Sequence, residues 1–138
     1  MNQSDSQLVF AMLKAASHID RKLDRALSCT KGVSFTEFQI LNELHVSYAG
    51  SATRVDLANA VRLTPSAITR ALKPLEKIGF VTTEKSDRDA RRSIATLSAA
   101  GKALLSDATR IIDDEIESMS LPSEHREELM MALKRIHS

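Results

Sequence analysis

Residues 64–83 read TPSAITRALKPLEKIGFVTT, and this stretch decides the fold. Thr64 and Pro65 have the order of a helix N-cap and a first helical residue, where the missing N–H of proline costs nothing. Gly79 suits the left-handed residue that ends a helix, and the aromatic and β-branched run at 80–83 is typical of a strand. The stretch therefore predicts a helix that leads directly into a β-strand.

The predicted helix has two contrasting faces. Apolar side chains recur at steps of three and four residues along one face, and polar or basic side chains recur along the other. The apolar set is Ala67, Ile68, Ala71, Leu72, Leu75 and Ile78, and the polar set is Ser66, Thr69, Arg70, Lys73 and Lys77. We expect the first face to lie in the core and the second to be cationic.

Pro74 lies inside this helix. A proline there removes the hydrogen bond to the carbonyl of Arg70 at a cost of roughly 3 kcal/mol, so we expect a kink near residues 70–74. A helix that ended before Pro74 would expose Leu75 and Ile78, so we expect the helix to continue.

The segments on either side complete the unit. Upstream, Thr53 can cap a short helix that has Asp56 in its first turn and ends before Arg62. Downstream, residues 80–97 have the pattern of a β-hairpin with a charged tip, which is too small to be stable alone. Two short helices joined by a tight turn and followed by a hairpin predict a winged helix-turn-helix.

Further helices are expected on both sides of this unit. An amphipathic stripe over about 5–30 ends at Gly32, and Ser34 with Glu37 forms a capping box that begins the next helix. A turn at 49–52 follows that helix.

At the other end, Ser98 can cap a pair of helices within 99–137, and the second helix of the pair is expected to begin near Pro122. The 138 residues are 43% hydrophobic and 27% charged, which is the balance of one globular domain. We therefore predict a single domain over 1–138, mainly α-helical with a small β-hairpin. Its winged helix-turn-helix lobe spans about 34–97, with flanking helices at about 5–30 and 99–137.

No run of about 18 apolar residues is present, and no basic stretch precedes an apolar region near the first residue. We therefore expect a cytoplasmic protein that has no membrane as a partner.

Positive charge is concentrated in the middle of the chain. Residues 54–92 carry nine basic and five acidic residues, whereas 93–138 carry five basic and eight acidic ones. This distribution is typical of an anion-binding module beside an assembly segment.

A basic helix followed by a hairpin with a basic tip fits double-stranded DNA. An α-helix fills the major groove and can hydrogen-bond to base edges, while a basic tip can reach a neighbouring minor groove or the backbone. The expected base-reading residues are Ser66, Thr69 and Arg70, the expected phosphate contacts are Lys73 and Lys77, and the tip residues are Arg88 and Arg91. The alternative is a winged helix used for protein contacts, as in an antitoxin or an assembly factor.

Five strings occur in a fixed order through this region. They are Leu57-Ala58, Leu63 to Arg70, Leu75 to Val81, Asp89 to Arg92 and Leu97 to Gly101. In this order and spacing they resemble the signatures of MarR-type transcriptional regulators, and the resemblance covers roughly residues 30–105. It implies a homodimer whose first and last helices interlock and whose two winged helices face a pseudo-palindromic operator. It also implies that Asp89 orients Arg91 for the minor groove.

The resemblance further implies a repressor that is released by a small anionic or aromatic ligand bound between the dimerisation helices and the DNA-binding lobe. His18 and His45 are the candidate residues for lining that ligand site, and zinc binding by them is a weaker alternative than an ordinary structural role. The apolar stripes of the flanking helices are expected to form the dimer seam. Its candidate residues are Leu8, Ile19, Ile111, Ile112, Leu129, Leu133 and Ile136.

The sequence contains no spacing that is typical of catalytic or metal-binding residues. No HxxxH or CxxC pair occurs, so we expect no enzyme activity, no metal site and no cofactor. The acidic run at 113–117 fits a solvated helix face better than a binding site. Cys29 is a weak candidate for a redox switch, because Lys31 is the only positive charge close to it in sequence.

Overall fold

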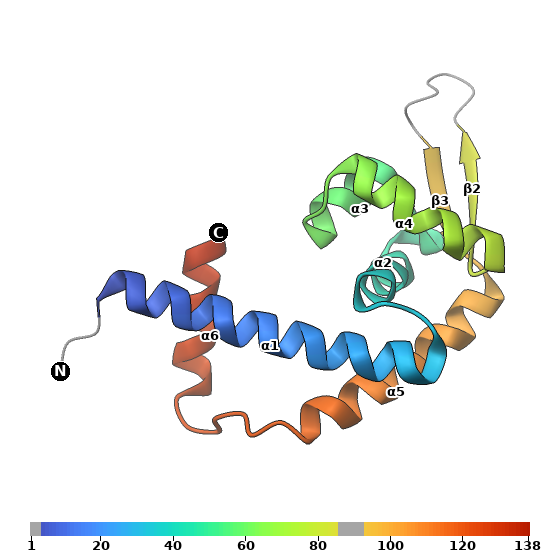
Figure 1. Cartoon of the computed structure of the whole chain (residues 1–138). Helices are drawn as coiled ribbons and strands as arrows, with labels where there is room; N and C mark the ends of the chain where they lie inside the picture. The colour runs from blue at the N-terminus through green and yellow to red at the C-terminus, as the bar shows by residue number, and fades with distance from the viewer. Residues whose placement is uncertain (1–3, 86–92) are drawn as a thin grey trace.

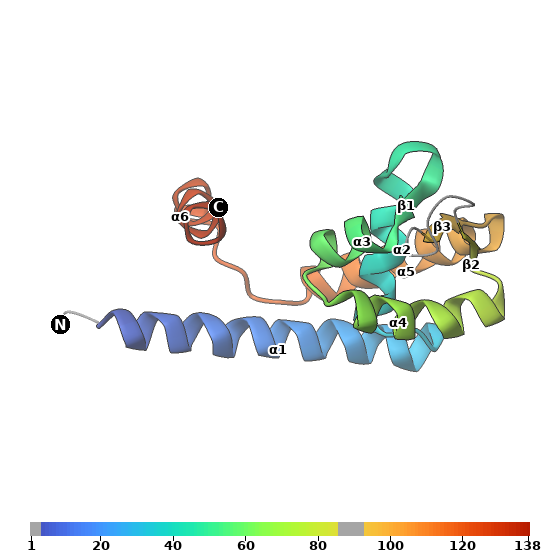
Figure 2. The same cartoon turned by 90° about the horizontal axis from the view of Figure 1, so that it is seen from above.

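The computed structural model describes residues 4–85 and 93–138. In chain order its elements are α1 (Asp5–Lys31), α2 (Phe35–Val46), the 3₁₀ helix η1 (Tyr48–Gly50), β1 (Ser51–Thr53), α3 (Arg54–Val61), α4 (Pro65–Ile78), β2 (Val81–Lys85), β3 (Ser93–Leu97), α5 (Ala99–Glu117) and α6 (Arg126–His137). Helices α2, α3 and α4 and the strands form a lobe that stands above α1 and α5 in Figure 1. Helix α6 lies on the side of the N-terminal half of α1 (Figure 2), and its last residue, His137, accepts a hydrogen bond from Arg62 of the lobe at 3.3 Å. Among the described residues, none of the helices combines the length and the apolarity that crossing a membrane requires.

Hydroxyl caps begin the helices where the sequence predicts them. Ser34 Oγ accepts a hydrogen bond from the backbone N–H of Glu37 at 3.0 Å, and Glu37 Oε1 accepts one from the N–H of Ser34 at 2.9 Å. Thr53, Thr64 and Ser98 each accept from the backbone N–H three residues further on. These bonds satisfy N–H groups that have no partner within their own helix, so the predicted helix starts are confirmed.

Helix α4 continues through Pro74, as expected, and ends at Gly79. Gly79 has a φ of 96°, a left-handed conformation that glycine adopts without the steric cost that a Cβ would bring. Burying a leucine contributes about 1.5–3 kcal/mol, comparable to the roughly 3 kcal/mol that an internal proline costs. Leu75, fully buried one residue beyond the proline, therefore offsets that loss. The kink near 70–74 stays a prediction.

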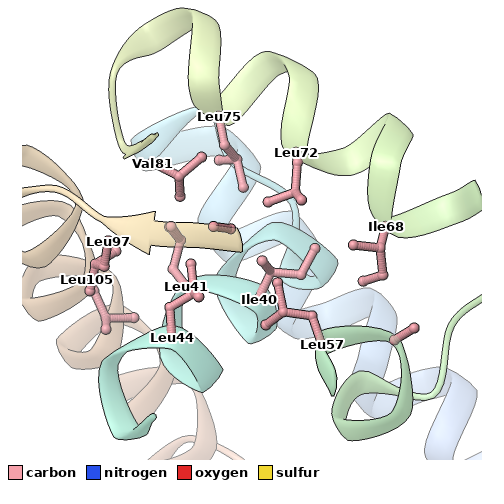
Figure 3. Packing of buried hydrophobic residues seen from close by; sticks show 12 residues of the cluster. Ile40, Leu41, Leu44, Leu57, Ile68, Leu72, Leu75, Val81, Leu97 and Leu105 are labelled. Atoms are coloured by element: carbon pink, nitrogen blue, oxygen red, sulfur yellow. The ribbon is translucent and has the colours of Figure 1, made fainter. Parts of the chain in front are cut away.

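Two apolar clusters form the interior. The larger one lies between α4 and the helices α2 and α3, and Figure 3 shows the leucine and isoleucine side chains of these helices pointing toward one another. The smaller one joins α1 to α5 and contains Leu23, Leu27, Val33, Ala108 and Ile112.

Two residues lie elsewhere than the sequence predicts. Ile112 does not belong to a dimer seam, because its side chain packs between α1 and α5 and is only 7% exposed. Ile78 is not in the core but 62% exposed. It is the last residue of α4, and it is not part of the apolar cluster that contains Leu75.

A three-stranded antiparallel sheet, in the order β1-β3-β2, forms the wing and its base. The predicted hairpin is confirmed by β2 and β3, in which Thr83 pairs with Ala95. The turn predicted at 49–52 is only partly right, because Ser51 and Ala52 belong to β1. The three residues of β1 are held by β3 and by a 2.8 Å hydrogen bond between Ser51 Oγ and Thr96 Oγ1, a tertiary contact that has no local sequence pattern.

Helix α6 begins at Arg126, so the predicted start near Pro122 is wrong. A proline at the first helical position needs a capping residue before it, and Leu121 has no side-chain oxygen to accept from the backbone. The helix begins instead where Glu127 and Glu128 place negative charge in its first turn, which is favourable at a helix N-terminus.

A close contact between α5 and the end of α4 generates a stability prediction. In an open helix, replacing glycine by alanine stabilises by about 1 kcal/mol. At Gly101, however, a Cβ would overlap the carbonyl oxygen of Phe80 and lie 2.7 Å from Leu97 Cδ1. We therefore expect Gly101→Ala to lower the free energy of unfolding by about 1–3 kcal/mol in urea denaturation.

The matched control is Ser106→Ala, an exposed change on the same helix that should leave the free energy of unfolding within about 0.5 kcal/mol. A stabilised Gly101→Ala variant would mean that α5 does not approach Phe80 this closely.

Candidate nucleic-acid interface

The outward face of α4 carries a single polar and basic stripe. Ser66, Arg70, Lys73 and Lys77 are all exposed. At about 100° per residue these four positions fall within an arc of about 60° on the helix surface. The buried residues Ile68, Leu72 and Leu75 project from the opposite side. Burial of the apolar side therefore directs the stripe to solvent, as the sequence predicts.

Thr69, predicted as a base-reading residue, lies at the edge of this stripe and is half-buried. Its hydroxyl donates to the carbonyl oxygen of Pro65 at 3.0 Å and accepts from Arg54 Nη1 at 2.8 Å. A hydroxyl has one hydrogen to donate, so Thr69 has none left for a base. The structure therefore gives Thr69 a role within the protein.

Arg54 is a residue that the sequence reasoning missed. It is the first residue of α3, and its guanidinium extends to α4 to reach Thr69. A signal was available, because a positive charge in the first turn of a helix is unfavourable beside the partial positive charge of the helix N-terminus. A cation at that position calls for another interaction, and the hydrogen bond to Thr69 is such an interaction.

A hollow of about 140 Å³ lies between α4 and the strands of the wing. Its lining combines three basic residues, one carboxylate and three hydroxyls. The lining residues are Arg54, Thr69, Leu72, Lys73, Glu76, Thr83, Lys85 and Ser93. Glu76 accepts a hydrogen bond from Thr83 Oγ1, which ties α4 to β2 across this hollow. The hollow adjoins the stripe, because Lys73 belongs to both.

The predicted wing-tip residues Arg88, Asp89 and Arg91 lie outside the described residues. The strands that carry the tip project from the lobe beside α4 (Figure 1), and Lys85 at the end of β2 is exposed. Lys85 of β2 and Lys73 of α4 lie on the same side of the lobe, because both line the hollow between α4 and the wing.

The two candidate ligand-lining histidines are not brought together. His18 lines a hollow of about 380 Å³ between α1 and residues 118–121. His45 lines another of about 490 Å³ between α2 and α5, beside Lys102 and Arg110. Across 4–85 and 93–138, no three His, Cys, Asp or Glu side chains are grouped as metal ligands would be.

Cys29 is exposed and lines a third hollow, of about 530 Å³, between α1 and α5. Lys22 and Arg25 on α1 also line it, whereas α5 contributes Ile111 and Glu115. The structure thus brings two basic residues near Cys29 besides its sequence neighbour Lys31.

A short helix, a tight turn, a second helix with a basic outer face and an antiparallel hairpin together define a winged helix-turn-helix domain. Residues 33–93 match the model of the MarR family. The winged-helix lobe is therefore similar to that of the MarR family.

One relative and two solved structures are also similar to this chain. An uncharacterised HTH-type transcriptional regulator of Bacillus subtilis, YwhA, is 33% identical over 75 residues, which cover 51% of this chain and 54% of that protein. The matched part thus spans about half the length of that relative. The structure of BldR, a transcriptional regulator from Sulfolobus solfataricus, superposes with a TM-score of 0.86 at 27% identity and covers 99% of this chain and 97% of its own. The structure of Sco3205, a MarR family regulator from Streptomyces coelicolor in complex with DNA, gives 0.87 at 24%, covering 99% and 92%.

The contact between Arg54 and Thr69 generates a prediction for stability. A hydrogen bond from a charged donor contributes about 1.5–3 kcal/mol, and partial exposure reduces that value. In a double-mutant cycle of Arg54→Ala and Thr69→Val, we therefore expect a coupling energy of about 1 kcal/mol by urea unfolding. Additive effects of the two substitutions would show that the contact does not join α3 to α4 in solution.

Proposed function

We propose that this protein is a sequence-specific regulator of transcription that binds a double-stranded DNA operator and acts as a repressor. The observation that carries the proposal is the exposed stripe of Ser66, Arg70, Lys73 and Lys77 on α4. An α-helix of this kind fits the major groove, and the strands beside it bring the wing toward a neighbouring groove. The match of residues 33–93 to the model of the MarR family supports the same function.

The stripe divides into two proposed roles. Ser66 and Arg70 lie in the first two turns of α4, where a helix that enters the groove by its N-terminal end approaches the base edges. Lys73 and Lys77 lie further along and contact phosphates. At the wing tip, Arg88 and Arg91 reach the minor groove or the backbone, and Asp89 orients Arg91.

The division between reading and phosphate contact can be tested with two variants. Arg70→Ala should cost about 1–3 kcal/mol on the preferred duplex and relax the preference at one base-pair position. Lys77→Ala should weaken binding to all duplexes alike and lower the salt dependence of the binding constant by about one unit per half-site. Competition binding at several salt concentrations, with the preferred and a scrambled duplex, measures both effects.

An equal loss for Arg70→Ala on the two duplexes would show that this residue does not read bases. A parent protein that binds neither duplex in a salt-dependent way would favour the alternative, a winged helix that contacts another protein.

We also propose that the protein acts as a homodimer. Apolar side chains of α1 and α6 are exposed in the single chain, among them Phe10 at 66%, Met131 at 60% and Ile136 at 63%. The predicted seam residues Leu8, Leu129 and Leu133 are exposed as well. Large exposed apolar surfaces mark association sites, and a two-fold dimer would present two α4 helices to the two halves of a pseudo-palindrome.

The dimer has a direct test. Sedimentation at micromolar concentration should give about twice the 15.2 kDa mass of one chain. Leu133→Glu should shift the protein toward the monomer, because a carboxylate cannot be buried unpaired in an apolar seam. The control is Ser106→Glu, which places the same charge at an exposed position of α5. A parent protein that sediments as a monomer would remove this proposal.

Release by a small ligand is part of the proposed function. The hollow beside His45 suits an anionic ligand, because Lys102 and Arg110 line it from α5. The hollow beside His18 combines Ile19, Met119 and Leu121 with Lys22 and two serines, so it suits a ligand that carries both apolar and polar groups. Both adjoin helices outside α4, so a ligand at either site would act through the helices that carry the lobe.

A further inference from the structure

The hollow between α4 and the wing has a composition that the stripe on α4 does not explain. Arg54 from α3, Lys73 from α4 and Lys85 from β2 reach it from three different elements. Thr69, Thr83 and Ser93 also line it, but the hydroxyls of Thr69 and Thr83 already donate to the Pro65 carbonyl and to Glu76. Three cationic groups that converge on a hollow of about 140 Å³ suit a phosphate group. We propose that this hollow binds one backbone phosphate of the bound DNA, and that Arg54 makes the main contact with that phosphate. The proposal rests on the proposed function.

The position of the hollow identifies the source of the phosphate. A duplex that receives α4 in its major groove and the wing in the adjacent minor groove must pass one sugar-phosphate strand between them. The hollow lies between α4 and the strands of the wing. A phosphate of that strand is therefore the anion that the docked duplex brings to this place.

Arg54 is held ready for such a ligand. Its Nη1 donates to Thr69 Oγ1 at 2.8 Å, and the Thr69 hydroxyl is itself fixed by its bond to the carbonyl of Pro65. The guanidinium has five N–H donors, and this hydrogen bond uses one of them. A half-buried guanidinium that is already oriented loses little side-chain entropy when it binds a phosphate, and its planar donors match two phosphate oxygens.

Glu76 reduces the net positive charge of the hollow. Its carboxylate lines the hollow, but it accepts from Thr83 Oγ1 and is thereby directed toward β2. Against three cations, one carboxylate leaves an excess of positive charge that suits the single charge of a phosphodiester. Removing this carboxylate by Glu76→Gln should strengthen binding to any duplex, because it removes a like-charge repulsion without changing the shape of the side chain.

The test removes the charge of single DNA phosphates and combines each removal with variants of the protein. A preferred duplex is first selected from a random pool with the parent protein. Each phosphate is then replaced, one position at a time, by a neutral methylphosphonate, and binding is measured for the parent, Arg54→Ala and Lys77→Ala. Besides the phosphate that Lys77 contacts, we expect one position in each half-site where the parent loses about tenfold in affinity through loss of the contact with Arg54.

At that position the methylphosphonate should not lower the affinity of Arg54→Ala, because this variant already lacks the guanidinium that binds the phosphate. Lys77→Ala, a control that removes a cation from α4 outside the hollow, should remain as sensitive there as the parent. Arg54→Lys should restore part of the sensitivity, since it keeps the charge but not the planar donors. Circular dichroism and urea unfolding establish that each variant is folded, so a loss of structure is distinguished from a loss of the phosphate contact.

Three results would overturn the proposal or what it rests on. Full sensitivity of Arg54→Ala at every position would show that Arg54 binds no backbone phosphate, while the proposed function would stand. Millimolar inorganic phosphate that stabilises the parent but not Arg54→Ala, together with no sensitive position on the duplex, would assign the hollow to free phosphate. A parent protein that fails to select any duplex from the pool would refute the proposed function itself.

Discussion

Burial of one side of α4 is the constraint on which the rest of the interface depends. Ile68, Leu72 and Leu75 pack against α2, α3 and the sheet and are between 0% and 3% exposed. Because a helix turns by about 100° per residue, fixing these three side chains in the core also fixes which residues face solvent. Burial of these three side chains is therefore enough to orient the basic stripe toward solvent. The hydrogen bond between Arg54 and Thr69 then limits how α4 can roll on α3.

The end of α4 is joined to the beginning of α5. Ser98 Oγ donates to the carbonyl of Gly79 at 2.6 Å, and the N–H of Ser98 donates to the carbonyl of Phe80 at 3.0 Å. Gly101 then allows α5 to lie against the Phe80 backbone. A displacement of α5 would therefore act on the C-terminal end of α4, which gives the proposed ligand and partner chain a physical route to the proposed DNA interface.

Helix α5 is in turn fixed to α1. The second apolar cluster fills the space between them, and Lys31 at the end of α1 contacts Asp107 of α5 at 3.3 Å. The hydrogen bonds that Asp107 accepts from Arg110 and Lys31 lower the pKa of its carboxyl, so the contact is charged at neutral pH and weakens only as the pH falls below the ordinary aspartate range. The lobe is thus supported by two helices that are packed against each other.

The sequence by itself determined the order of the helices and of the β2–β3 hairpin, because caps, helix-ending glycines and apolar spacing are local signals. Ser34, Thr53, Thr64 and Ser98 cap the predicted helices, and the spacing along α4 separated core from stripe. Only the tertiary structure decided the pairing of β1 with β3, the burial of Ile112 within the chain and the contact of Arg54 with Thr69. Each of these joins residues from different elements, and the position of one element against another depends on packing that no local pattern records.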